Sequence, residues 1–151
     1  MRLTRQTNYA IRMLMYCAAN DGQLSRVAAV AGAYGVSDLF LFKILQPLVE
    51  AGFMETVRGR NGGIRLAKPA GSISLLDVVK TTEENFAMAE CFEDDGTDCP
   101  LLGSCALNGA LREALNAFFA VLGRYTIDDL VAPNPMLGSL LGLEPGIRPV
   151  A

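Results

Sequence analysis

The sequence predicts a mainly α-helical protein that carries one short β-hairpin. Apolar residues recur at helical spacing in three segments before residue 50 and again over residues 106–125. Between these segments, two short runs flank the glycine-rich stretch 58–63, which is typical of a hairpin. The chain has 151 residues, of which 51% are hydrophobic, so it is long enough for one domain, or a domain with an appendage, around its own core.

The first segment is expected to form a helix from about Thr7 to Asn20. Ala10, Leu14 and Cys17 fall on one apolar stripe, and the turn-forming residues 20–22 should end the helix. Arginines interrupt the apolar residues, so the segment resembles neither a membrane span nor a signal peptide. We therefore expect a cytoplasmic protein with no membrane partner.

Residues 25–50 predict two helices joined by a tight turn. The second helix should run from about Ser25 to Tyr34, and residues 35–37 should lead into the third, for which Ser37 is a good N-cap. The buried stripe of that third helix consists of Leu41, Ile44, Leu45 and Leu48. Pro47 lies within this pattern and, because it lacks an N–H group, is expected to kink the helix or end it early. Such a pair is typical of a helix-turn-helix, whose second helix enters the major groove of DNA.

A short β-hairpin is expected next, with strands over residues 53–57 and 64–66. The connecting loop is basic and rich in glycine, and it consists of Arg58, Gly59, Arg60, Asn61, Gly62 and Gly63. The Asn-Gly-Gly sequence should supply the positive-φ positions of the turn, and its small residues would let backbone amides approach a phosphate or a minor groove. Taken alone, the loop is compatible with an ordinary solvated hairpin, but after a helix-turn-helix it is predicted to be a wing.

The charge of the chain changes sign along its length. The net charge is -3, yet residues 1–70 contain nine Lys and Arg against four Asp and Glu, whereas residues 71–151 contain four against twelve. A basic half can bind phosphates while an acidic half stays off DNA. The overall negative charge therefore does not exclude a nucleic-acid partner.

Three cysteines follow a short helix that Ser74 should cap and that should run from Leu75 to about Thr81. Cys91, Cys99 and Cys105 are spaced as Cys-x7-Cys-x5-Cys. The surrounding segment is acidic and includes Glu90, Glu93, Asp94, Asp95 and Asp98. Thiolates close to so many carboxylates are disfavoured unless a cation compensates their charge. This pattern favours metal chemistry.

The spacing alone leaves several kinds of site open. It lacks the paired CxxC motifs of common zinc sites, and zinc would need a fourth donor. Three thiolates can hold an iron–sulfur cluster with one iron left to a different ligand. Redox-active thiols and cysteines without a function remain alternatives, and Cys17, on an apolar helix stripe, is expected to be a core residue. The chain has no histidine, which excludes histidine ligands and histidine bases, and no catalytic constellation emerges, so we do not expect an enzyme.

The last third of the chain predicts one long helix and a tail. Residues 107–125 carry apolar side chains at helical spacing and are too apolar to stay in water. The helix is either a core helix or, since helix-turn-helix proteins commonly bind as two-fold dimers, a dimer interface. Residues 131–151 are rich in Pro and Gly and are expected to form a loosely ordered tail.

Four segments together resemble a known family over about residues 1–130. They are the opening MRLTRQTNYAIRML, the helix VSDLFLFKILQPLVEAG, the wing VRGRNGGIRL and the cysteine segment ECFEDDGTDCPLLGSCAL. The sequence resembles the winged-helix iron–sulfur repressors that include IscR and NsrR. The resemblance implies a DNA-binding region over 1–70, a linker helix and cluster loop over 71–106, and a dimerisation helix over 107–130. It also implies a homodimer in which these helices cross and each cysteine loop packs near the partner's DNA-binding region.

The resemblance further implies the functional residues. Cys91, Cys99 and Cys105 would hold an iron–sulfur cluster, with 4Fe–4S favoured over 2Fe–2S. Double-stranded operator DNA would be contacted by Ser37, Leu39, Phe40, Phe42, Lys43, Arg58, Arg60, Asn61, Gly62 and Gly63. Some relatives carry polar residues where this chain has Leu39, Phe40 and Phe42, and apolar side chains read thymine methyl groups, which suggests an AT-biased operator.

The fourth cluster ligand stays open in the sequence. Some relatives use a histidine, and others use an aspartate from the partner's first helix, where this chain has Asn8. Water, a small thiol, Asn8, Glu90 or Asp98 are candidates. The favoured hypothesis is an iron-responsive repressor of iron-uptake genes. The alternatives are an iron–sulfur or thiol redox protein that transfers electrons, and a zinc-bound winged-helix regulator.

Overall fold

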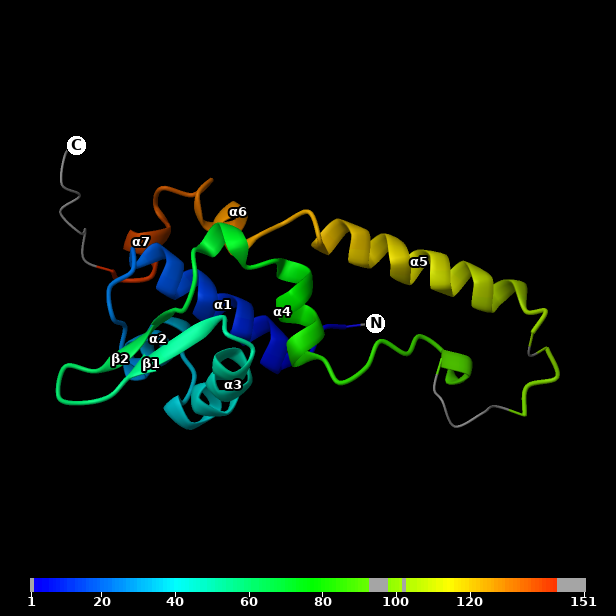
Figure 1. The fold of residues 1–151 in the computed structure, drawn as a ribbon, viewed down its shortest axis with the longest axis horizontal. Helices are drawn as coiled ribbons and strands as arrows, with labels where there is room; N and C mark the ends of the chain where they lie inside the picture. The colour runs from blue at the N-terminus through cyan, green and yellow to red at the C-terminus, as the bar shows by residue number, and fades with distance from the viewer. Residues whose placement is uncertain (1, 93–97, 102, 144–151) are drawn as a thin grey trace.

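The computed structural model describes residues 2–92, 98–101 and 103–143. Figure 1 shows a compact body from which one long helix, α5, projects. The elements are α1 (Arg5–Ala19), α2 (Val27–Tyr34), α3 (Asp38–Glu50), β1 (Met54–Val57), β2 (Gly63–Leu66), α4 (Leu75–Thr82), α5 (Ala106–Leu122), α6 (Ile127–Val131) and α7 (Leu137–Leu140), with single 3-10 turns η1 (Ala70–Ser72) and η2 (Glu90–Phe92). The predicted class, mainly helical with one hairpin, is confirmed.

Helix α1 lies at the centre of the body and packs against α3, α4 and α6. It begins at Arg5, two residues earlier than predicted, because Thr4 caps it: the Thr4 Oγ1 accepts a hydrogen bond from the Thr7 N–H at 3.2 Å. Cys17 is 1% exposed in the core, as its place on the apolar stripe predicted. Burial raises the pKa of the Cys17 thiol to about 12.

Helices α2 and α3 form the predicted helix-turn-helix. They meet at 117°, within the range of about 90–120° for this motif, and Gly35 ends α2 in the left-handed conformation with φ of 64°. Helix α2 begins two residues later than predicted. Ser25 instead joins the edge of the hairpin, where its N–H donates to the Ile64 carbonyl at 2.9 Å and its carbonyl accepts from the Ile64 N–H at 2.8 Å.

Ser37 caps α3 as predicted, since its Oγ accepts a hydrogen bond from the Phe40 N–H at 3.3 Å. Of the two expected effects of Pro47, a kink or an early end, the early end is wrong, because α3 continues to Glu50. An interior proline costs a helix about 3 kcal/mol. Burial of one Leu or Ile side chain stabilises by roughly 1.5–3 kcal/mol, and α3 buries four: Leu41, Ile44, Leu45 and Leu48. Packing therefore outweighs the missing hydrogen bond.

The hairpin pairs β1 with β2 in antiparallel register, from Met54 opposite Leu66 to Val57 opposite Gly63. The expectation that Asn61, Gly62 and Gly63 would supply positive φ is wrong, because in this loop only Gly59 has it, at 111°. Gly62 and Gly63 are needed instead because neighbouring backbone lies too close to them to leave room for a Cβ atom. A Cβ on Gly62 would lie 2.2 Å from the Val57 carbonyl oxygen, and one on Gly63 would lie 2.6 Å from that of Ser25.

After α4 the chain leaves the body and returns at residue 125. The return is fixed by hydrogen bonds from the Leu75 N–H to the Tyr125 carbonyl at 2.9 Å and from the Ile127 N–H to the Ile73 carbonyl at 3.0 Å. Helix α5 ends at Leu122, three residues before the predicted end, and Thr126 opens α6 with a reciprocal capping box.

Residues 131–143 of the predicted loose tail lie within the described part of the chain. Helix α7 forms there, and Leu141 and Leu143 pack against the core. These apolar side chains hold the segment despite its Pro and Gly content. Residues 144–151 of the predicted tail lie outside the described residues.

Helix α5 buries none of its side chains within the chain, although most of them are apolar. Among the described residues, no single helix has the length and apolar composition of a membrane span; α2 and α3 pass that test only as a bent pair, on length and composition alone.

Candidate cysteine site and nucleic-acid interface

The three loop cysteines line one cavity of about 480 Å³ at the far end of α5. Cys91 lies in η2, Cys99 lies in the following loop, and Cys105 is the N-cap of α5, where its Sγ accepts from the Asn108 N–H at 3.4 Å. Cavities of roughly 300–1,000 Å³ are the usual size of small-molecule and cofactor sites. The structure thus brings together three cysteines of which the first and the last are fourteen positions apart in the sequence.

The cysteines line the wall of a cavity and do not converge on a single metal-ion position. Within the described ranges, no three His, Cys, Asp or Glu side chains lie close enough to hold one metal ion. Glu90 lines the adjoining part of the cavity, and Asp98 is exposed. Glu93, Asp94 and Asp95 lie outside the described residues.

The side chains of Asn108 and Arg112 also line this cavity. The Asn108 Nδ2 donates to the Cys91 Sγ at 2.9 Å, and the Asn108 Oδ1 accepts from the Arg112 Nε at 2.8 Å. The Arg112 guanidinium lies 4.8 Å from the ring centroid of Phe92, the neighbour of Cys91. Arg112 is the only cationic side chain among the residues that line the described part of the cavity.

The predicted DNA-reading residues of α3 do not all face solvent. Leu39 is 76% exposed and Phe42 is 53% exposed, and Lys43 and the capping Ser37 are also exposed. Phe40 differs, because its ring packs edge-on against Tyr9 with centroids 5.4 Å apart and lies 4.8 Å from the Arg5 guanidinium. Phe40 therefore joins α3 to α1 and is less available to a base than Phe42.

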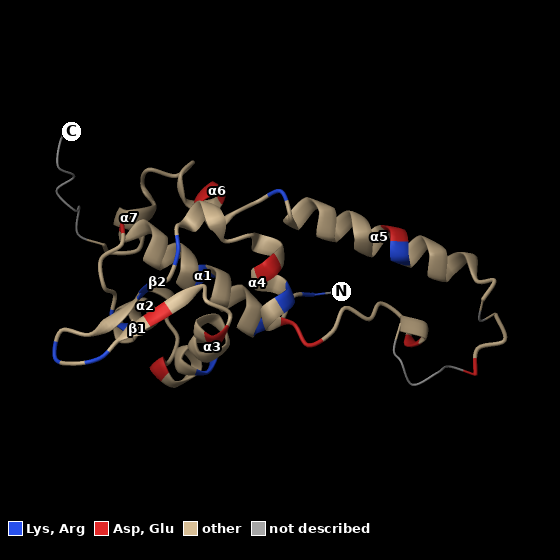
Figure 2. Cartoon of the chain, viewed as in Figure 1, with Lys and Arg blue, Asp and Glu red and all other residues tan. Residues whose placement is uncertain are grey.

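The predicted wing residues lie together in the loop between β1 and β2. Arg58, Arg60 and Asn61 are exposed, and Figure 2 shows the basic residues of this loop at the edge of the body. Below the loop, Arg65 of β2 pairs with Glu55 of β1. The two arginines of the loop are thus free of that ion pair.

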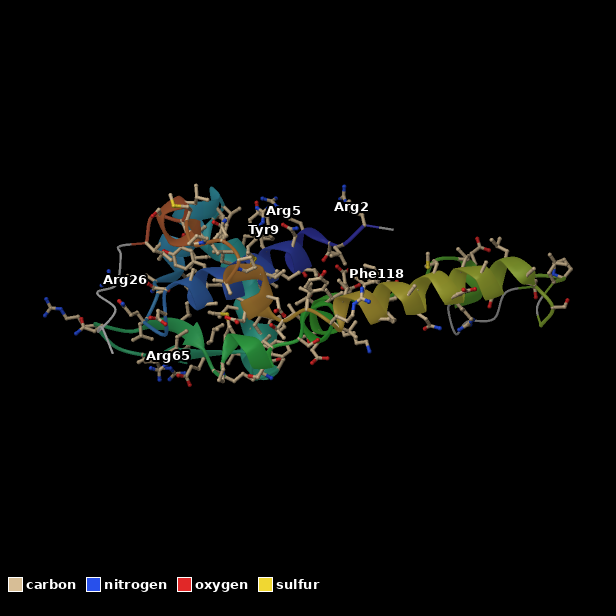
Figure 3. All side chains as sticks on the ribbon, turned by 90° about the horizontal axis from the view of Figure 1, so that it is seen from above. Arg2, Arg5, Tyr9, Arg26, Arg65 and Phe118 are labelled. Carbon is tan, nitrogen blue, oxygen red and sulfur yellow. The ribbon has the colours of Figure 1, made fainter. Side chains whose placement is uncertain are left out.

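Two arginines of α1, which the sequence reasoning did not single out, lie beside the helix-turn-helix. Arg5 and Arg12 both lie over the Tyr9 ring, at 5.5 and 5.0 Å from its centroid, and Arg12 lies 5.7 Å from that of Tyr34. Figure 3 shows Arg5 and Tyr9 side by side on α1. Neither arginine has an acidic partner in the described part of the chain. The signal in the sequence was their spacing, because residues 5, 9 and 12 share one face of a helix.

The family model of Rrf2, described as an iron-dependent transcriptional regulator, matches residues 3–133. The chain belongs to the Rrf2 family. It is 68% identical over 149 residues to "Protein aau3" of Rhizobium meliloti (strain 1021). The aligned region covers 99% of this chain and 97% of that relative. It is 44% identical over 142 residues to the HTH-type transcriptional regulator NsrR of Geobacillus kaustophilus (strain HTA426), which covers 93% and 97%. The Rrf2 relatives are transcriptional regulators and not enzymes.

A solved structure of the same architecture agrees with this assignment. The oxidised form of Staphylococcus aureus CymR superimposes with a TM-score of 0.71 at 26% sequence identity, covering 87% of this chain and 96% of that one. The IscR of T. potens gives a TM-score of 0.68 at 18% identity, covering 88% of each chain, and supports the fold alone. The winged-helix architecture that the sequence predicted is confirmed.

Proposed function

We propose that this Rrf2 family protein is an iron-responsive repressor that binds operator DNA as a homodimer while an iron–sulfur cluster is bound to Cys91, Cys99 and Cys105. Loss of the cluster releases the DNA and derepresses iron-uptake genes. Within the family, the sequence resembles the rhizobial iron regulator RirA. The observation that carries the proposal is the convergence of three cysteines on one cavity in a chain that also presents an exposed helix-turn-helix and wing.

The donor set at the cavity fits an iron–sulfur cluster. A 4Fe–4S cluster binds each thiolate to a different iron, so the cysteines need to surround a volume and not to meet at one ion. The Asn108 side chain and backbone supply hydrogen-bond donors to two of the sulfurs. When bound, the cluster supplies a cationic iron–sulfide core that offsets the acidic loop and responds to iron and oxidants.

Three cysteines leave one iron to another ligand. Glu90 lines the adjoining cavity and is an acidic candidate within the chain. Asn8 is exposed on α1, in the body and away from the tip of α5, so it would have to come from a partner subunit. Water or a small thiol are the remaining candidates.

The homodimer is supported by the surface of α5. Apolar side chains of this helix are exposed, such as Leu107 at 65% and Val121 at 43%, and the helix buries none of its residues in its own chain. A contiguous exposed apolar surface is the usual mark of an interface. With 17 residues, α5 is about 25 Å long, which separates the cysteines from the body of their own chain. A second copy whose α5 crosses this one would bring the cysteines near the partner's DNA-binding region. The cluster could then influence DNA binding.

The DNA contacts follow from the exposed residues. Leu39, Phe42 and Lys43 would enter the major groove, and Arg58 and Arg60 would meet phosphates or the minor groove. The guanidinium groups of Arg5 and Arg12, stacked on aromatic rings without acidic partners, would bind backbone phosphates beside α3.

One experiment tests the proposal on a single sample. The protein is reconstituted anaerobically with iron and sulfide, its cluster content is measured by native mass spectrometry, and its affinity is measured for a duplex selected by the holo-protein from a random pool. Cys99→Ala should lose both cluster and tight DNA binding, whereas the control Cys17→Ala should keep both. Equal affinity of the holo- and apo-proteins at matched salt would favour a redox protein. Stoichiometric zinc without iron would favour a zinc-bound regulator.

A further inference from the structure

Asn108 contacts two of the three loop cysteines at once. Its side-chain Nδ2 donates to the Cys91 Sγ at 2.9 Å, and its backbone N–H donates to the Cys105 Sγ at 3.4 Å. The backbone bond follows from the position of Asn108 in the first turn of α5, where Cys105 serves as the N-cap. The side-chain bond does not follow from helix geometry and is a property of this residue type.

Arg112 fixes which way the Asn108 amide points. Its Nε donates to the Asn108 Oδ1 at 2.8 Å, and a guanidinium can donate hydrogen bonds but cannot accept them. The amide oxygen must therefore face Arg112, and the NH₂ group must face Cys91. The Arg112 guanidinium is itself held 4.8 Å from the centroid of the Phe92 ring, so α5 contacts η2 both at Cys91 and at Phe92.

We infer that Asn108, oriented by Arg112, is a positioning residue that sets the reduction potential of the cluster and the rate at which the cluster is lost. The inference rests on the proposed cluster at Cys91, Cys99 and Cys105. A hydrogen bond to a ligating sulfur withdraws electron density from it and stabilises the more negative, reduced state, which raises the potential. The positive charge of Arg112 beside the cavity acts in the same direction.

The sharpest variant is Asn108→Asp. Aspartate has nearly the same shape and still accepts from Arg112, but it turns an acceptor towards the Cys91 sulfur in place of a donor. The control is Asn116→Asp, which makes the same change of charge on an exposed position of the same helix, two turns farther from the cysteines. Asn108→Ala removes the donor without adding charge.

Three properties of the reconstituted proteins are compared anaerobically: the reduction potential, the iron–thiolate stretching bands in resonance Raman spectra, and the rate of iron transfer to a chelator. Asn108→Asp and Asn108→Ala should lower the potential, shift the Raman bands and release iron about 10-fold faster, the lower end of the effect of removing an outer-sphere partner. Asn116→Asp should match the wild type. Arg112→Gln should change the three properties in the same direction as Asn108→Ala. Combining these two changes should add only the effect of the lost Arg112 charge, because the hydrogen bond to Cys91 is already removed.

The outcomes separate this inference from the proposed function. A wild-type protein that holds a cluster, together with Asn108 variants that match it in all three properties, would overturn the inference and leave the proposed function intact. An equal effect of Asn116→Asp and Asn108→Asp would assign the change to distant charge and overturn it as well. A wild-type protein that binds no cluster after reconstitution would overturn both.

Discussion

The hydroxyl groups of Thr7 and Thr82 lie 2.8 Å apart and form a hydrogen bond between α1 and the last residue of α4. Thr7 is fully buried, and the neighbouring Thr4 N–H donates to the Glu83 Oε1 at 2.7 Å. The start of α1 is thereby joined to the point where the chain leaves the body towards the cysteines. Arg5 on the same turn lies against Phe40 of α3, so one short path connects α4 to the helix-turn-helix.

Thr7→Val is expected to lower the free energy of unfolding by about 1–2 kcal/mol, because it removes the hydrogen bonds of the buried Thr7 hydroxyl to Thr82 and to Thr4 while nearly preserving volume. Thr82 keeps its second partner, the Val78 carbonyl at 2.9 Å, which limits the loss. Thr81→Val, at an exposed position of α4 next to Thr82, is the control and should change stability by less than about 0.5 kcal/mol. Urea denaturation measures both; equal losses in the two variants would contradict the role of Thr7.

Phe40→Ala should affect mainly stability and Phe42→Ala mainly DNA recognition, because the two rings have different surroundings. Phe40 packs against Tyr9 and the core, so its loss should destabilise the fold by about 2 kcal/mol. Phe42 is exposed, so its loss should leave stability nearly unchanged and alter the base preference. Stability is measured by urea denaturation of each variant, and base preference is measured by sequencing the duplexes that each variant selects from a random pool. An altered base preference in Phe40→Ala alone, with wild-type stability, would reverse this assignment.

The features that the sequence predicted correctly depend on local patterns. Ser37 caps α3 and Gly35 ends α2 because a cap and a left-handed turn require particular residue types at particular places. Cys17 is a core residue because helical periodicity places it beside Ala10 and Leu14.

The features that the sequence missed depend on contacts between distant segments. Ser25 leaves α2 because it pairs with Ile64, and Phe40 turns inward because Tyr9 covers it. Leu141 and Leu143 of the predicted tail pack against a core built by earlier helices. No local pattern in the chain encodes these partners. The convergence of Cys91, Cys99 and Cys105 on one cavity could be expected only from the family resemblance, because their spacing alone left several sites open.

Arg58→Ala, Arg60→Ala and Arg12→Ala are each expected to weaken DNA binding for all sequences and to reduce the slope of log affinity against log salt by about 1. Each change should remove one phosphate contact, so that one counterion fewer is released on binding. Arg124→Ala is the control, since this residue lies between α5 and α6, away from α3 and the hairpin. Affinities of the holo-protein at several salt concentrations measure the slopes. An unchanged slope in Arg12→Ala would remove α1 from the interface.

Gly62→Ala should disrupt the wing more than any other single change to alanine in its loop. The new Cβ would lie 2.2 Å from the Val57 carbonyl oxygen, which is backbone and cannot rotate away. The loop should therefore lose its shape, and DNA affinity should fall about as far as with both loop arginines removed, while the helical core remains folded. Asn61→Ala, at an exposed position, is the control. Circular dichroism and DNA binding distinguish a lost wing from a lost fold.

The buried Cys17 thiol should make the protein less stable in alkali. Burial raises its pKa from the ordinary 9.0 to about 12, so the folded chain keeps a proton that the unfolded chain loses. The stabilisation is fully present below pH 9 and is lost as the pH rises towards 12, by up to about 1.4 kcal/mol per pH unit.

Burial also raises the pKa of Tyr16 and that of Tyr34, the latter from 10.0 to about 12, so the tyrosines contribute mainly above pH 10 and the difference between wild type and Cys17→Ala from pH 9 to pH 10 reports Cys17. Urea denaturation of the apo-protein across this interval should show a shallower fall in stability for Cys17→Ala than for the wild type. Because alanine fills less of the core, Cys17→Ala should also start from a lower stability at pH 7. Parallel pH profiles for the two proteins would mean that Cys17 ionises in the folded state as readily as in the unfolded chain, contrary to its burial beside Leu14 and Met13.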